Sequence, residues 1–127
     1  MILIDASAWV EFLRDTGSPA CTRVDELLGG DFATCQPIRM ELLAGARDDR
    51  HLDQLRGLLA RAVLLATPPA HYEMAAALYR TCRRHGVTVR RLIDCLIAAH
   101  AIDAGIALLH DDVDFEALAR CTALELA

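Results

Sequence analysis

Short apolar runs alternate along the chain with longer segments in which apolar residues recur every three or four positions. Continuous apolar runs are typical of buried strands, and the longer spacing is typical of helices with one buried face. Strands are predicted at residues 1–5, 32–35, 63–67 and 106–110, with a final edge strand at 122–127. Helices are predicted at residues 7–14, 19–28, 37–46, 49–62, 71–85, 91–105 and 112–121.

This alternation favours an α/β fold, because parallel strands need a helical connection between them and are covered by those helices on both faces. We therefore expect a three-layer sandwich built on a short, mostly parallel sheet. The 127 residues are enough for one hydrophobic core, so residues 1–127 are expected to form a single domain.

Composition excludes several classes of protein. Apolar residues make up 54% of the chain, which argues against disorder. No apolar run approaches the roughly 18 residues of a membrane span, and no signal-peptide pattern is present, so we expect a cytoplasmic protein without membrane contact. The cysteines are odd in number and irregularly spaced, which argues against a disulfide framework or a zinc site; they are Cys21, Cys35, Cys82, Cys95 and Cys121.

The net charge of −5 argues by itself against a nucleic-acid partner. The basic residues are all of one kind, however: all 13 are arginine and none is lysine. Arginine binds phosphate in a bidentate manner. An acidic total could also conceal a group of carboxylates that a bound metal neutralises.

Carboxylates follow the predicted strands, at the positions where ligands gather in α/β folds. Asp5 ends the first strand, Glu41 lies in the helix after the second, and Asp112 and Asp114 follow the strand at 106–110. Asp94 lies one turn into an otherwise apolar helix.

Each acid has an ordinary alternative: Asp5 and Asp112 as helix caps, Glu41 as a solvated side chain and Asp94 in an ion pair with Arg90 or Arg91. Together they favour a different interpretation, because converging carboxylates repel one another unless cations lie between them. Oxygen ligands of this kind suit Mg²⁺ or Mn²⁺. Such ions, held by carboxylates, catalyse phosphodiester hydrolysis in many nucleases.

Four segments in order resemble PIN-domain ribonucleases, and more narrowly the VapC-type toxins of toxin–antitoxin pairs. They are ILIDASAWVEFL, PIRMELLAG, RLIDCLIAAHAIDAG and LLHDDVDFEALA, and they span nearly the whole chain. The resemblance implies a PIN-like sandwich and a catalytic quartet of Asp5, Glu41, Asp94 and Asp112. It departs from the family at Ala6 and His110, where Thr or Ser is frequent.

The resemblance also implies the roles of the site residues. Asp5 and Asp94 would be the principal metal ligands, Asp112 and Asp114 further ligands, and Ser7 an auxiliary hydroxyl that orients Asp5 or a metal-bound water. His110 is expected to be a bystander.

The implied reaction is Mg²⁺- or Mn²⁺-dependent endonucleolytic cleavage of RNA by two-metal-type hydrolysis. The implied partners are a VapB-like antitoxin, which inserts a segment near the site and blocks it, and a second copy of the chain in a homodimer. DNA would be reached only through the antitoxin.

A cluster of arginines precedes Asp94 and gives RNA a predicted path towards the acids, although a solvated helix end explains it equally well. The residues assigned to RNA are Arg83, Arg84, Arg90 and Arg91. Trp9, Tyr72 and Tyr79 are expected to pack inside the protein rather than to stack on bases.

Two other classes place aspartates at strand ends, the haloacid-dehalogenase-like phosphatases and the response-regulator receivers. Both rely on a lysine, which this chain lacks. The remaining alternative is a catalytically idle PIN-like module that acts only by binding partners.

Overall fold

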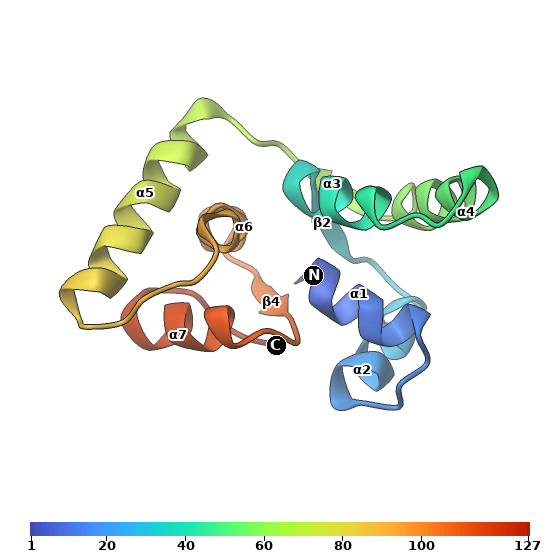
Figure 1. The fold of residues 1–127 in the computed structure, drawn as a ribbon, viewed down its shortest axis with the longest axis horizontal. Coiled ribbons are helices and arrows are strands. Elements are labelled where there is room, and N and C mark those ends of the chain that lie inside the picture. The colour runs from blue at the N-terminus through green and yellow to red at the C-terminus, as the bar shows by residue number, and fades with distance from the viewer.

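The computed structural model describes residues 1–127, and it is an α/β fold in which four short parallel strands are surrounded by seven helices. Figure 1 shows α5, α6 and α7 grouped on one side of the molecule, and α1 to α4 on the other. The elements are β1 (Ile2–Ile4), α1 (Ala6–Leu13), α2 (Pro19–Leu27), β2 (Ala33–Cys35), α3 (Gln36–Ala44), α4 (Asp49–Leu59), β3 (Val63–Leu65), α5 (Pro69–Arg84), α6 (Leu92–Ala104), β4 (Ala107–Leu109) and α7 (Val113–Cys121).

The strand order is β3-β2-β1-β4, and every pairing is parallel. Leu3 is opposite Ala33 on one side and Leu108 on the other. The expected α/β class is confirmed, and the sheet is wholly rather than mostly parallel. Because the strands run the same way, β1, β2 and β4 all end at one edge of the sheet.

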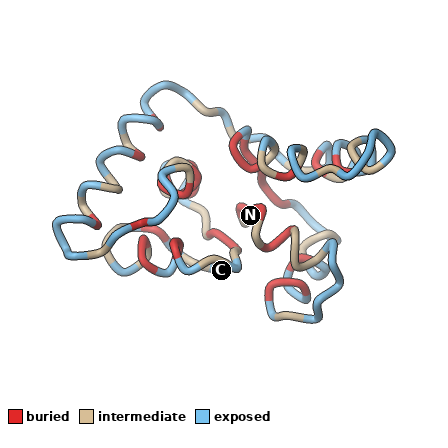
Figure 2. Tube along the Cα trace, in the orientation of Figure 1, coloured by how far each residue is buried: buried red, intermediate tan, exposed pale blue.

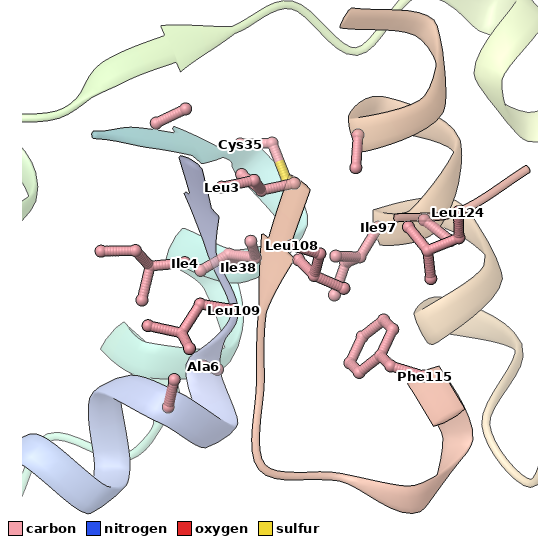
Figure 3. Packing of buried hydrophobic residues seen from close by; sticks show 14 of the residues in the cluster. Leu3, Ile4, Ala6, Cys35, Ile38, Ile97, Leu108, Leu109, Phe115 and Leu124 are labelled. Atoms are coloured by element: carbon pink, nitrogen blue, oxygen red, sulfur yellow. The ribbon is translucent and has the colours of Figure 1, made fainter. Parts of the chain in front are cut away.

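The core lies on both faces of the neighbouring strands β1 and β4. In Figure 3, Leu108 points towards Ile97 and Phe115, whereas Ile4 and Leu109 lie on the other side of the strands. All five are buried, and Figure 2 shows buried segments concentrated along the strands and the inward faces of the helices. Full burial of such apolar side chains contributes roughly 1.5–3 kcal/mol each.

Helix α6 is the most buried helix, since seven of its residues are buried. It ends at Gly105, whose φ of 64° places it in the left-handed region that favours glycine. This is the end predicted from the sequence. Trp9 is fully buried, as expected, and packs edge-on against Phe32.

Three expectations about packing are wrong. β3 is an edge strand that is not covered on both faces, and Val63 and Leu64 are exposed there. Residues 122–127 form no strand, because only a single bridge joins Leu126 to Leu108. Tyr72 is 59% exposed instead of packing inside, whereas Tyr79 does pack against the core.

The cysteines are all free thiols, and four of the five are buried, as expected of small apolar side chains. None of the helices combines the length and the apolar character needed to cross a bilayer.

Candidate active site

Asp5 follows β1 and uses one carboxylate oxygen to begin α1. Its Oδ2 accepts hydrogen bonds from the Ser7 backbone N–H at 2.9 Å and from the Ser7 hydroxyl at 2.5 Å. Its Oδ1 is buried without any hydrogen-bond partner. Burial raises the pKa of Asp5, and the hydrogen bonds from Ser7 only partly oppose this effect.

Ser7 connects the ends of β1 and β4. Its hydroxyl donates to Asp5 Oδ2 and accepts a hydrogen bond from the backbone N–H of Asp111 at 2.9 Å. The Asp5 backbone N–H also donates to the Leu109 carbonyl at 2.9 Å. The loop that carries Asp112 is therefore fixed beside Asp5.

Asp112 is the N-cap of α7 and faces Arg90. Its Oδ1 accepts from the Asp114 backbone N–H at 2.9 Å and from Arg90 Nη2 at 2.9 Å. The Asp112 backbone N–H donates to His110 Nδ1 at 3.0 Å. His110 is therefore in contact with a site residue, a contact that the bystander interpretation does not include.

Asp114 is 2% exposed and holds the segment that leads into α6. Its Oδ1 accepts from both the backbone N–H and Nε of Arg90, each at 3.1 Å, and its Oδ2 accepts from the Arg91 backbone N–H at 3.0 Å. Burial alone would raise the pKa of Asp114, but hydrogen bonds from Asp94, Arg90 and Arg91 outweigh it and lower the pKa.

Asp94 lies in the first turn of α6 and is also 2% exposed. Its Oδ2 has no hydrogen-bond partner. Burial, followed by a hydrogen bond with the Asp114 carboxyl group, raises the pKa of Asp94 to about 8. The expected alternative of an ion pair with Arg90 or Arg91 is wrong, because both arginines bond to other acids.

Glu41 reaches the same place from α3. Its Oε2 pairs with the Arg91 guanidinium, and its Oε1 is buried without a partner. Burial raises the pKa of Glu41, although the hydrogen bond from Arg91 acts against it.

These acids leave three buried carboxylate oxygens without a donor: Asp5 Oδ1, Glu41 Oε1 and Asp94 Oδ2. When such a carboxyl group is ionised its oxygens only accept, so each buried one needs a hydrogen-bond donor or a cation. Asp94, Asp112 and Asp114 also each offer an oxygen within 4.8 Å of the others. Residues of this chemistry fit a hard divalent cation such as Mg²⁺ or Mn²⁺.

A cavity of about 660 Å³ opens beside these acids. Asp5, Ser7, Glu41, Arg91 and Asp112 line it, and Asp94 is not among the lining residues. The cavity also has an apolar wall from α1, α3 and α4, made by Val10, Leu13, Leu42, Leu55 and Leu58.

The four arginines assigned to RNA fall into two pairs. Arg90 and Arg91 lie at the site, where they bond to its carboxylates. Arg83 and Arg84 lie in the last turn of α5 and do not line the cavity. The ion pairs at the site join residues at least 22 positions apart, so no local pattern in the sequence could have found them.

Comparison with known proteins agrees with this architecture. The family model described as "PIN domain" matches residues 2–120. The chain therefore belongs to the PIN-domain family, and within that family to the VapC group.

The second part of that assignment rests on full-length relatives. Ribonuclease VapC11 of Mycobacterium tuberculosis is 47% identical over 131 residues, which cover 100% of this chain and 98% of the relative. Ribonuclease VapC51 of the same species is 28% identical over 94% of this chain and 86% of its own length.

A solved structure with the same fold is the DNA-bound VapBC of Salmonella typhimurium. It superposes with a TM-score of 0.78 at 17% identity and covers 99% of this chain and 96% of that one. At this identity the likeness concerns the fold alone.

Proposed function

We propose that the chain is an endoribonuclease toxin that cleaves RNA with Mg²⁺ or Mn²⁺ and is neutralised by a VapB-like antitoxin. The observation that carries this proposal is the set of three buried carboxylate oxygens without donors, contributed by the end of β1, by α3 and by α6. The name of its relative VapC11, a ribonuclease, supports RNA as the substrate.

In this proposal Asp5 and Asp94 hold the cation, with Asp112 and Asp114 as further ligands and Glu41 completing the catalytic quartet. A bound divalent ion supplies an activated water and positive charge beside the phosphate. Ser7 fixes the Asp5 carboxyl group by donating two hydrogen bonds to Oδ2, which leaves Oδ1 for the cation. Asp5, Glu41 and Asp112 line the cavity, so a phosphate in the cavity would lie beside these acids.

The arginines supply the complementary charge for RNA in an acidic chain. Arg83 and Arg84 are exposed at the end of α5, and the side chain of Arg91, at the cavity, is 49% exposed. We propose that these residues steer the RNA backbone towards the acids. Arg90 belongs to the same group, although its guanidinium already bonds to two aspartates.

The apolar wall of the cavity supports a partner segment as well as a substrate. Val10, Leu13, Leu42, Leu55 and Leu58 lie beside the acidic residues, so an antitoxin segment with apolar side chains would cover them and close the site. The VapBC complex of Salmonella typhimurium supports such a partner, and any contact with DNA would come through the antitoxin. We further propose that residues 1–127 act as a single PIN domain in a cytoplasmic homodimer.

The experiment uses purified chain and total cellular RNA in buffers with Mg²⁺, Mn²⁺ or EDTA. Asp5→Asn is the loss variant, because asparagine can still cap α1 but cannot carry the negative charge. Asp25→Asn is the matched control, since Asp25 is exposed on α2. We expect discrete fragments that require metal, persist with Asp25→Asn and disappear with Asp5→Asn.

Induced expression should likewise arrest growth, and Asp5→Asn should relieve the arrest. If folded, antitoxin-free protein cleaves no RNA under any of these conditions, the chain is instead the idle interaction module.

A further inference from the structure

Arg90 and Arg91 are neighbours in sequence but have different surroundings. Arg90 donates from Nη2 to Asp112 at 2.9 Å and from Nε to Asp114 at 3.1 Å, so two carboxylates fix its guanidinium. Arg91 contacts one carboxylate, Glu41, and does so through Nη2. The side chain of Arg91 is 49% exposed.

The backbone of Arg91 is fixed even though its side chain is partly free. Its N–H donates to Asp114 Oδ2 at 3.0 Å, and the residue is the N-cap of α6. The guanidinium therefore extends from a fixed point at the cavity wall, which it shares with Asp5, Glu41 and Asp112.

Arg91 also stands out among the basic residues of the cavity. Arg14, Arg47 and His51 line the cavity too, but none of them forms an ion pair. Among the basic residues of the cavity, Arg91 is the one that pairs with a carboxylate of the cavity, that of Glu41. In the free chain it therefore lies where a divalent cation would compete for Glu41.

We propose that Arg91 exchanges partners during binding: it pairs with Glu41 in the free chain and moves to an RNA phosphate when cation and RNA are present. This inference rests on the proposed function. A divalent cation beside Glu41 repels the guanidinium, while a phosphate offers it two acceptor oxygens in the fork geometry that arginine matches best. The exchange leaves both Glu41 oxygens available to the site.

The exchange predicts opposite effects on two ligands when Arg91 is replaced. Arg91→Gln removes a cation that competes for Glu41, so Mn²⁺ should bind about threefold more tightly in the absence of RNA. The same variant loses a charge-assisted contact to phosphate, so RNA should bind about tenfold more weakly. A purely structural role for Arg91 would weaken both.

The test measures Mn²⁺ binding by electron paramagnetic resonance and RNA binding by fluorescence anisotropy. The RNA probe is a fluorescein-labelled single strand of mixed sequence, used in Ca²⁺ buffer and checked by gel to stay intact. Arg23→Gln is the matched control, because it also removes one positive charge and breaks an arginine–glutamate pair, on α2 away from the cavity. Arg91→Lys keeps the charge without the fork and should bind RNA with intermediate affinity.

The expected result is tighter Mn²⁺ and weaker RNA binding for Arg91→Gln, with both affinities of Arg23→Gln close to those of the wild type. Weaker Mn²⁺ binding by Arg91→Gln, or affinities equal to those of Arg23→Gln, would overturn the exchange. A wild-type chain that neither cleaves RNA nor binds Mn²⁺ would instead refute the proposed function, so the two failures are distinguishable. Thermal unfolding in EDTA establishes that each variant is folded.

Discussion

The two oxygens of the Asp5 carboxyl group have different surroundings. One caps α1 through Ser7, and the other is buried without a donor. The sequence left open whether this aspartate is a cap or faces a cation, and the structure supports the cap directly. The unpartnered oxygen is what makes the same residue suitable for a metal.

The Asp94 carboxyl group makes stability depend on pH. Its pKa is about 8 in the folded chain against an ordinary value of 3.8, so between these values the folded chain retains a proton that the unfolded chain releases. Stability in metal-free buffer should therefore fall as pH rises through this range. Asp94→Asn, which does not ionise, should melt at a higher temperature than wild type at pH 8 and show no such advantage near pH 4.

Thermal unfolding in EDTA at both pH values checks this, and Asp25→Asn, which keeps Asp94, should melt at the wild-type temperature at each pH. A lower melting temperature of Asp94→Asn at pH 8 would mean that the ionised carboxylate stabilises the fold.

The Ser7 hydroxyl links Asp5 to the loop after β4, so its removal should affect both stability and cleavage. Ser7→Ala loses the bond to Asp5 Oδ2 and leaves the Asp111 N–H without its acceptor, at a cost of about 1 kcal/mol. We also expect cleavage to fall about tenfold, because the Ser7 backbone N–H alone then restrains the Asp5 carboxyl group.

Ser18→Ala is the matched control, since Ser18 caps α2 and its loss costs a similar amount. Urea unfolding and cleavage rates should show equal destabilisation but lost activity in Ser7→Ala alone. Equal activities would mean that the Ser7 hydroxyl stabilises the fold and has no part in cleavage.

At the scale of elements, the start of α6 depends on a residue in α7. Asp114 accepts the backbone N–H groups of Arg90 and Arg91, and it is buried. Its sequence neighbours identify it only as one acid of a D-x-D pattern. The link between α7 and α6 appears once the chain has folded, because the partners lie more than 20 positions apart.

Asp114→Ala should destabilise the protein by about 2–3 kcal/mol, because it leaves two backbone donors and Arg90 Nε without their acceptor. Glu116→Ala in the same turn of α7 should change stability by less than about 1 kcal/mol, since Glu116 is 59% exposed. Urea unfolding of both variants measures the difference. Similar values for the two would show that Asp114 does not hold the start of α6.

The helices were predicted well from local patterns, because the capping residues, prolines and glycines that begin or end a helix lie next to it in sequence. The predicted helix start at residue 19 and the predicted helix end at residue 105 agree with the structure, where α2 begins at Pro19 and Gly105 is the C-cap of α6. The positions of the strands in the sheet were harder to predict, because they depend on contacts between residues that are distant in sequence. The apolar run that starts at Val63 predicts a strand covered by helices on both faces, but it lies at an edge of the sheet. The segment at Leu126 joins β4 through one bridge.

At the scale of the whole molecule, the parallel sheet is what gathers the acids. β1 and β4 are adjacent and end together, which brings Asp5 beside Asp112 across more than 100 residues of sequence. The sequence predicted this convergence from the rule for parallel sheets. It did not predict the strand order or the arginines that partly neutralise the site, because both depend on distant contacts.

The central claim is that these acids hold the divalent cation that RNA cleavage requires. The most direct test follows bound Mn²⁺, by electron paramagnetic resonance, and the rate of RNA cleavage in a single Mn²⁺ titration of the wild type and Asp94→Asn. We predict that the two wild-type curves have the same midpoint and that Asp94→Asn loses both binding and cleavage. Cleavage that proceeds in EDTA, or that persists in Asp94→Asn without bound Mn²⁺, would contradict the claim.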